Sequence, residues 1–149
     1  MAPYVPSPQE IIDRMLEVAH ARQGDMVIDL GCGDGRILVT AVQKFQAKAV
    51  GIEIDPKIAA QASDMIVRLG LQNKARVVRA DVFDVDLSQA DIVTLYLTTS
   101  FNEKLRPKFE KALRPGTRVI GVEPEGSAVM SLSLAAGSPQ RLTTNRTIA

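Results

Sequence analysis

Aromatic residues are scarce in this chain: tryptophan is absent, and aromatic residues make up only 4% of the 149 residues. There is therefore little material for the stacked rings that binders of single-stranded nucleic acid use. A surplus of one charge is also lacking, because 18 basic and 17 acidic residues leave a net charge of +1. The composition thus gives no reason to expect a nucleic acid or an anionic membrane as a partner.

Cysteine and long apolar runs are also in short supply. The single cysteine, Cys32, cannot form a disulfide within the chain, which is typical of a reducing compartment. No apolar run approaches the roughly 20 residues needed to span a bilayer, and the first residues do not form a signal peptide. We therefore expect a cytoplasmic protein without stable membrane insertion.

The chain does have enough apolar material for one folded domain. Hydrophobic residues make up 46% and charged residues 23%, which is ordinary for a globular protein. A chain of this length buries roughly two thirds of its unfolded surface. We expect a single domain over residues 1–149, with an extended proline-rich segment at 1–8 and a divergent tail at 126–149.

A glycine loop follows the first apolar strand, and the rest of the chain is organised around it. Met26–Leu30 predicts a buried parallel strand, and a helix is expected from Ile37. Gly31, Gly33 and Gly35 lie between the two. A strand that leads into a helix through glycines directs backbone N–H groups and the positive end of the helix dipole at a ligand. The pattern predicts a site for a small, nucleotide-like molecule.

The spacing of this loop argues against a nicotinamide or flavin dinucleotide. The dinucleotide fingerprint G-x-G-x-x-G/A needs a small third residue, because the helix must pack closely on the strand. Arg36 stands at that position. A nicotinamide-dependent enzyme is therefore disfavoured.

A second motif follows at the distance that a nucleotide-binding fold requires. Ala49–Glu53 predicts a strand that ends in an acid, and Asp55 and Pro56 predict the N-cap and first position of the next helix. Glu53 lies 20 residues after Gly33 (53 − 33), close to the spacing at which a carboxylate meets a ribose diol. Its two oxygens can each accept a hydrogen bond from one hydroxyl. The plainer alternative is an exposed acid at the end of a strand.

Helical and strand patterns alternate along the chain. Helices are expected at 8–21, 37–45, 56–69 and 102–113, and strands at 26–30, 49–53, 75–80, 90–97 and 118–122. This alternation predicts a doubly wound, Rossmann-like α/β fold with a mostly parallel sheet, in which ligands gather at the carboxyl ends of the strands. Asp29, Glu53, Asp81 and Tyr96 fall at or near those ends.

The tail of the chain allows two interpretations. Residues 128–135 and 140–148 are compatible with two short strands, which would form a shortened C-terminal antiparallel hairpin. The same residues are also compatible with a frayed terminus. We favour the hairpin.

The run Asp29-Leu-Gly-Cys-Gly-Asp-Gly35 resembles the first motif of class I S-adenosylmethionine-dependent methyltransferases. Within that class, three further stretches are similar to the small seven-strand protein-lysine methyltransferases of archaea: Pro3-Tyr-Val-Pro-Ser-Pro8, Val93-Thr-Leu-Tyr-Leu97 and Leu105-Arg-Pro-Lys-Phe-Glu110. Mitochondrial relatives of that family modify lysines of inner-membrane proteins. The similarity covers residues 3 to 120. It implies transfer of methyl groups from S-adenosylmethionine to protein lysines, with S-adenosylhomocysteine as the other product.

The resemblance implies a set of cofactor-binding residues: Tyr4, Asp29, Gly31, Cys32, Gly33, Glu53, Ile54, Asp81, Val82 and Tyr96. The glycine loop would surround the methionine part, with Cys32 acting through its backbone. The residues after the second and third strands would hold the ribose and adenine, and the two tyrosines would line the methyl-transfer end. Substrate-side candidates are Thr98, Thr99 and Asn102. We assign no catalytic base and expect no metal site.

Several of these roles have structural alternatives. Asp81 is also placed to cap the turn after its strand, Tyr4 to anchor the N-terminal segment over apolar surface, and Tyr96 to fill the core. The Asn/Asp-Pro-Pro-Tyr signature of enzymes that methylate adenine or glutamine is missing where Tyr96 stands, which argues against nucleic-acid bases as substrates.

The chain departs from the family after the fifth strand, where Gly121–Gly126 replaces a polar segment that carries tryptophan. Because that segment normally forms part of the substrate wall, two alternatives stay open. One is a methyltransferase that acts on a small molecule such as an amine, and the other is a cofactor-binding module without catalytic activity. The sequence leaves the oligomeric state open.

Overall fold

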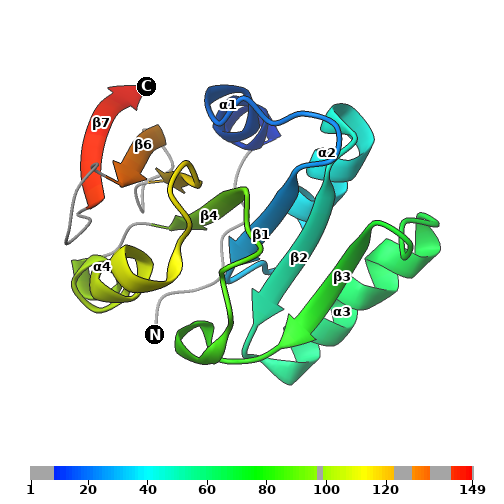
Figure 1. The fold of residues 1–149 in the computed structure, drawn as a ribbon. Coiled ribbons are helices and arrows are strands. Elements are labelled where there is room, and N and C mark those ends of the chain that lie inside the picture. Colours follow the sequence, from blue (N-terminus) through cyan, green and yellow to red (C-terminus); the bar gives the residue numbers. More distant parts are fainter. Residues whose placement is uncertain (1–8, 97–98, 123–128, 135–141, 149) are drawn as a thin grey trace.

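The computed structural model describes residues 9–96, 99–122, 129–134 and 142–148. Helices and strands alternate over most of this range (Figure 1). In chain order the elements are α1 (Gln9–Val18), β1 (Met26–Leu30), α2 (Arg36–Phe45), β2 (Lys48–Glu53), α3 (Pro56–Arg68), β3 (Ala75–Arg79), the short 3₁₀ helix η1 (Val82–Asp84), β4 (Ile92–Tyr96), α4 (Thr99–Ala112), β5 (Arg118–Val122), β6 (Val129–Leu134) and β7 (Leu142–Ile148).

All of these strands belong to one sheet with the order β3-β2-β1-β4-β5-β6-β7. The pairs from β3 to β5 are parallel, whereas β5–β6 and β6–β7 are antiparallel. The predicted C-terminal hairpin is therefore present. Strand β1 lies between β2 and β4, so the chain winds outward in both directions from it. In such sheets the ligand crevice opens at the carboxyl ends of the strands beside this switch point.

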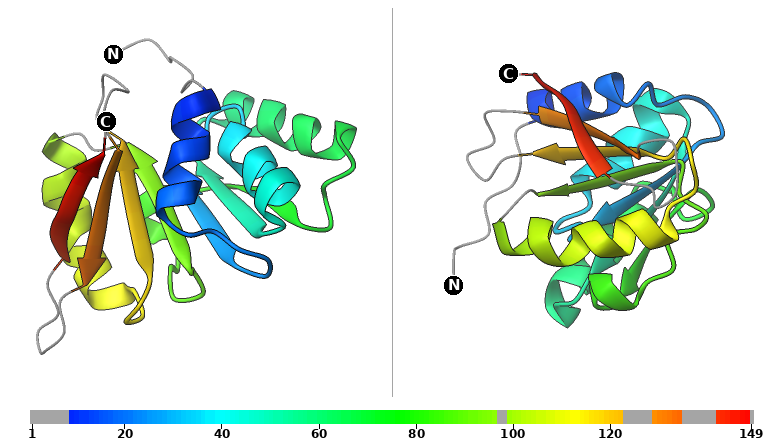
Figure 2. Two further views of the ribbon diagram at one scale, coloured as in Figure 1. Left: turned by 90° about the horizontal axis from the view of Figure 1, so that it is seen from above. Right: turned by 60° about the vertical axis from the view of Figure 1, so that its left-hand side comes forward.

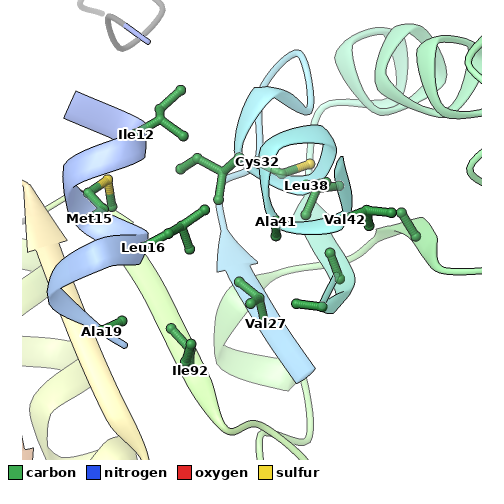
Figure 3. Close-up of a cluster of buried hydrophobic side chains, with 14 of the residues drawn as sticks. Ile12, Met15, Leu16, Ala19, Val27, Cys32, Leu38, Ala41, Val42 and Ile92 are labelled. Atoms are coloured by element: carbon green, nitrogen blue, oxygen red, sulfur yellow. The ribbon is translucent and has the colours of Figure 1, made fainter. Parts of the chain in front are cut away.

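Helices cover both faces of the sheet, as predicted. Helices α1, α2 and α3 lie on one face and α4 lies on the other (Figure 2). Alternate residues of the central strands contribute to one of two apolar clusters: Val27 packs with α1–α3, whereas Ile28 packs with Leu105 and Phe109 of α4. Figure 3 shows the first cluster, in which α1 side chains face β1 and α2. Burial on both faces explains why the central strands read as unbroken apolar runs.

Two helix boundaries follow from their capping residues. Helix α3 begins as predicted, with Pro56 at its first position and the Asp55 carboxylate accepting hydrogen bonds from the backbone N–H groups of Lys57 and Ile58 at 2.9 and 3.1 Å. Helix α1 was expected to reach residue 21, but it ends at Val18. His20 takes a left-handed conformation with φ 53°, and the following N–H returns to the helix, which is a C-terminal cap more often built with glycine.

Helix α4 and strand β4 also differ from the prediction. Helix α4 begins at Thr99 rather than at residue 102, and it contains the exposed Pro107. Thr99 and Ser100 are poor helix formers, so the sequence pattern alone places the start of the helix too late. Strand β4 begins at Ile92 rather than at residue 90, because the Ala90 N–H closes a turn onto the Leu87 carbonyl. In the part of the chain that the structure describes, no helix has the length and apolar character needed to cross a membrane.

Candidate active site

The glycine loop after β1 has a backbone that only glycine adopts readily. Gly31, Gly33 and Gly35 have φ angles of 79°, 55° and 86°, all in the left-handed region where a Cβ is strained. The backbone N–H groups of Gly31 and Cys32 both donate to the Ile52 carbonyl of β2, at 2.8 and 3.0 Å. The loop is thereby fixed at the carboxyl ends of β1 and β2. A Cβ added at Gly31 would meet no atom within 4 Å, so the space beside it is open.

Glu53 joins this loop to the end of β2. Its Oε1 accepts a hydrogen bond from the Gly33 N–H at 3.1 Å, and its Oε2 accepts one from the Asp55 N–H at 3.2 Å. The structure thus brings together the acid predicted for the ribose and the glycine predicted for the methionine part. Because each carboxylate oxygen can accept two hydrogen bonds, both retain capacity for a hydroxyl group.

Asp29 is a buried acid at the carboxyl end of β1. Thr94, which is opposite Asp29 in the β1–β4 pairing, donates a hydrogen bond of 2.7 Å from Oγ1 to the Asp29 Oδ1. The pKa of Asp29 is raised to about 7, mainly by burial and also by the nearby charges of Glu53 and Asp34, against the lowering effect of the Thr94 hydrogen bond. Sequence analysis missed Thr94. The available signal was a threonine in an otherwise apolar strand.

The glycine loop and Asp29 line a pocket whose other walls are mostly apolar. Its lining consists of Ile12, Met15, Asp29, Gly31, Cys32, Gly33, Asp34, Arg36, Ile37, Leu95 and Val122. Two of these side chains, Ile12 and Met15, come from α1, which sequence analysis did not connect with the site. Burial, together with the charges of Asp29 and Glu53, raises the pKa of the Cys32 thiol. A protonated, buried thiol is a poor nucleophile, which agrees with the prediction that Cys32 acts through its backbone.

The ends of β2 and β3 form the neighbouring part of the site. The Ala80 N–H donates to the Glu53 carbonyl at 3.2 Å, so the residues after β3 lie beside those after β2. Ile54 is 62% exposed there, and Val82 is half-buried. Asp81 caps η1, because its Oδ1 accepts from the Phe83 N–H at 3.0 Å. The capping role considered for Asp81 is therefore present, and its Oδ2 is the oxygen left to contact a ligand.

Some of the predicted site residues cannot be compared with the structure. Tyr4 and Thr98 lie outside the described residues. Tyr96 ends β4, and Thr99 and Asn102 lie in the first turn of α4, but their side chains are outside the described part. Their roles stay predictions. Among the residues that are described, no group of three or more His, Cys, Asp or Glu side chains could hold a metal ion.

The chemistry of these groups fits S-adenosylmethionine. A carboxylate suits its ribose diol, an exposed apolar residue such as Ile54 suits one face of its adenine, and open glycine backbone allows the methionine part to approach closely. A buried carboxylate such as Asp29 suits its ammonium group. The donors and acceptors present at this edge therefore match the predicted cofactor.

Comparisons with known proteins agree with this geometry. The model of the ANTKMT methyltransferase domain family matches residues 29–123. A protein-lysine N-methyltransferase of Saccharolobus islandicus is 48% identical over 122 residues, which are 81% of this chain and 76% of that protein. The adenine nucleotide translocase lysine N-methyltransferase of Mus musculus is 32% identical over 79% of this chain and 51% of its own length. The chain thus spans about half the length of this mammalian relative.

A solved structure shows the same agreement. An RNA methyltransferase from Salinibacter ruber, in complex with S-adenosyl-L-homocysteine, superposes with a TM-score of 0.77 and is 41% identical, over 83% of this chain and 81% of that one. The fold and the site therefore define a class I methyltransferase that depends on S-adenosylmethionine, which confirms the predicted fold class, enzyme class and cofactor. Within this class, the chain belongs to the ANTKMT methyltransferase domain family.

Proposed function

We propose that this protein transfers methyl groups from S-adenosylmethionine to lysine side chains of a protein substrate. The observation that carries the proposal is the 48% identity with an archaeal protein-lysine N-methyltransferase over most of both chains. The site supports it, because the pocket beside the glycine loop has apolar walls that suit the alkyl part of a lysine. We expect the protein to act in the cytoplasm.

In this proposal different residues bind different parts of the cofactor. Asp29 and the backbone of Gly31, Cys32 and Gly33 hold the methionine part, and Glu53 holds the ribose. Ile54, Asp81 and Val82 hold the adenine. Tyr4 and Tyr96 line the methyl-transfer end, and Thr98, Thr99 and Asn102 lie on the substrate side.

The bound cofactor supplies an activated methyl group, so the protein must supply alignment and a neutral amine. With an ordinary pKa of about 10.4, a lysine is deprotonated in about one molecule in a thousand near pH 7.4, a cost of about 4 kcal/mol. Positioning in a reactive geometry contributes roughly 7–11 kcal/mol, so no dedicated base is required. Apolar walls such as Ile12 and Met15 also favour the neutral amine by desolvation. We assign no catalytic base.

Calorimetric titration with S-adenosylmethionine and S-adenosylhomocysteine tests the cofactor site first. The second step is transfer of a labelled methyl group to three pools: lysate proteins, small amines and RNA, the last because of the name of the Salinibacter ruber relative. We expect micromolar binding, and label on lysine side chains that mass spectrometry identifies.

Other outcomes would redirect the proposal. Label on small amines alone would make the protein a small-molecule methyltransferase. Label on RNA alone would contradict our expectation that no nucleic acid is a partner. Binding without transfer to any pool would support a cofactor-binding module without activity.

A further inference from the structure

Lys108, in the third turn of α4, makes an unusual set of hydrogen bonds. Its Nζ donates to three backbone carbonyls of the loop between β3 and β4: Val82 at 3.1 Å, Phe83 at 2.7 Å and Val85 at 2.7 Å. A lysine ammonium has three N–H donors, so each is matched by one carbonyl. These acceptors lie 23 to 26 residues away in the chain.

Within the loop that Lys108 contacts, the η1 segment is the exposed part, whereas Leu87 further along is buried in the second apolar cluster. None of the residues of η1 is buried, and Phe83 is 41% exposed. Two hydrogen bonds of this segment are local: the Phe83 N–H donates to the Asp81 carboxylate, and the Asp84 N–H donates to the Asp81 backbone carbonyl. Three carbonyl dipoles that converge on one point repel one another unless a cation lies between them. The charge on Lys108 therefore stabilises this particular loop conformation.

Helix α4 is a firm support for such a contact. Leu105 and Phe109 flank Lys108 on the helix, and each is only 1% exposed in the second apolar cluster. Lys108 thus connects the η1 end of the loop to the helix that packs on the core, in addition to the burial of Leu87. Val82 and Val85 are themselves only partly buried against that cluster.

We propose that Lys108 is a positioning residue for cofactor recognition: by holding the carbonyls of η1, it sets the orientation in which Asp81 and Val82 meet the adenine edge. This inference rests on the proposed cofactor site. Lys108 acts through the loop and does not itself touch the cofactor. Its loss should therefore weaken recognition of the adenine edge more than it weakens binding of the ribose and methionine parts.

The test compares two ligands, S-adenosylhomocysteine and S-inosylhomocysteine, in which an oxygen replaces the adenine amino group. In Lys108→Met we expect about tenfold weaker binding of S-adenosylhomocysteine, equivalent to about 1.4 kcal/mol. We also expect a clear fall in the preference for S-adenosylhomocysteine over S-inosylhomocysteine. A general loss of protein stability would weaken the binding of both ligands to the same extent, and would leave the ratio of their affinities unchanged.

Matched variants complete the experiment. Lys111→Met removes an exposed lysine from the same helix and should change neither affinity nor preference. Lys108→Arg keeps a cation with several donors and should restore most of the preference. If Lys108→Met does not fold, Lys108→Gln takes its place. An unchanged preference in a folded variant that lacks the Lys108 cation would overturn the inference.

Hydrogen exchange separates this inference from the proposed function. Without ligand, the Phe83 and Asp84 amides should exchange faster in Lys108→Met than in the wild type, whereas amides in β1 should be unaffected. One outcome is that the wild type binds no S-adenosylhomocysteine while the Phe83 and Asp84 amides still exchange faster in Lys108→Met. In that case the proposed cofactor site is wrong, but the contact between Lys108 and the loop is confirmed. If the loop amides do not respond, Lys108 does not hold the loop.

Discussion

Two loops at the same edge of the sheet are held in different ways. The loop after β1 is fixed by its own glycine conformations and by groups of the adjacent strand, the Ile52 carbonyl and the Glu53 carboxylate. The loop after β3 is held by Lys108, which reaches it from α4, and by the burial of Leu87 in the second apolar cluster. The loop after β1 depends on a local sequence motif, which can be recognised in the sequence. The loop after β3 depends on the fold and leaves no such motif.

The largest effect is expected from breaking the first loop where the cofactor approaches. Gly33→Val should abolish cofactor binding, because a branched side chain is placed where the backbone has φ 55° and donates to Glu53. Calorimetry with S-adenosylhomocysteine measures this. Gly70→Val is the matched control: it also imposes a side chain at positive φ (71°) with no atom within 4 Å, and it follows α3 away from the glycine loop. Normal binding by Gly33→Val would mean that the loop does not hold the cofactor.

The next largest effect is a loss of stability, expected when a side chain is added where the loop after β1 packs closely on β2. A Cβ added at Gly51 would lie 2.6 Å from the Cys32 Sγ and 2.7 Å from the Leu38 Cδ1. Gly51→Ala should therefore lower the free energy of unfolding by about 1–3 kcal/mol, the usual cost of overpacking. Denaturant unfolding measures the change. A variant as stable as the wild type would show that the loop can move away from β2.

Glu53→Ala removes the side chain that joins the loop after β1 to β2. Losing hydrogen bonds to a charged group should weaken cofactor binding by about 1–3 kcal/mol. Glu53→Gln keeps the shape of the side chain and should show a smaller loss. If Glu53→Ala binds S-adenosylhomocysteine as tightly as the wild type, the ribose lies elsewhere.

The last effect is a change in how the free energy of unfolding depends on pH. The folded pKa of Asp29 is about 7, above its ordinary 3.8, so between about pH 4 and 7 the folded state holds a proton that the unfolded state has lost. Stability from this group is therefore lost as the pH rises through that window. Relative to the wild type, Asp29→Asn should gain about 4 kcal/mol of stability between pH 4 and pH 8, because the folded and ordinary pKa values differ by about 3.2 (7 − 3.8). A difference that does not vary with pH would contradict the raised pKa.

The parts of the fold that follow local rules could be predicted from the sequence. The glycine loop, the strand that ends at Glu53 and the cap formed by Asp55 and Pro56 were all placed correctly. Each depends on residues that are close in sequence and have a strong conformational preference. The C-terminal hairpin was predicted from the same kind of pattern, and the structure has it.

The features that were missed depend on contacts between distant residues. Thr94 lies 65 positions from Asp29, and nothing in either strand indicates that their side chains meet. Met15 of α1 reaches the pocket only because the fold lays α1 beside the glycine loop. Helix α1 also ends early because His20, rather than a glycine, takes the left-handed conformation, and Arg118 donates to the carbonyls of Ala19 and His20.

The most direct test of the central claim is calorimetric titration of S-adenosylhomocysteine into the wild type and into Glu53→Ala. The account predicts micromolar binding to the wild type and weaker binding to the variant, because Glu53 lies at the junction of the glycine loop and β2. Absence of binding to a folded wild-type sample would contradict the account, and so would equal binding to both proteins.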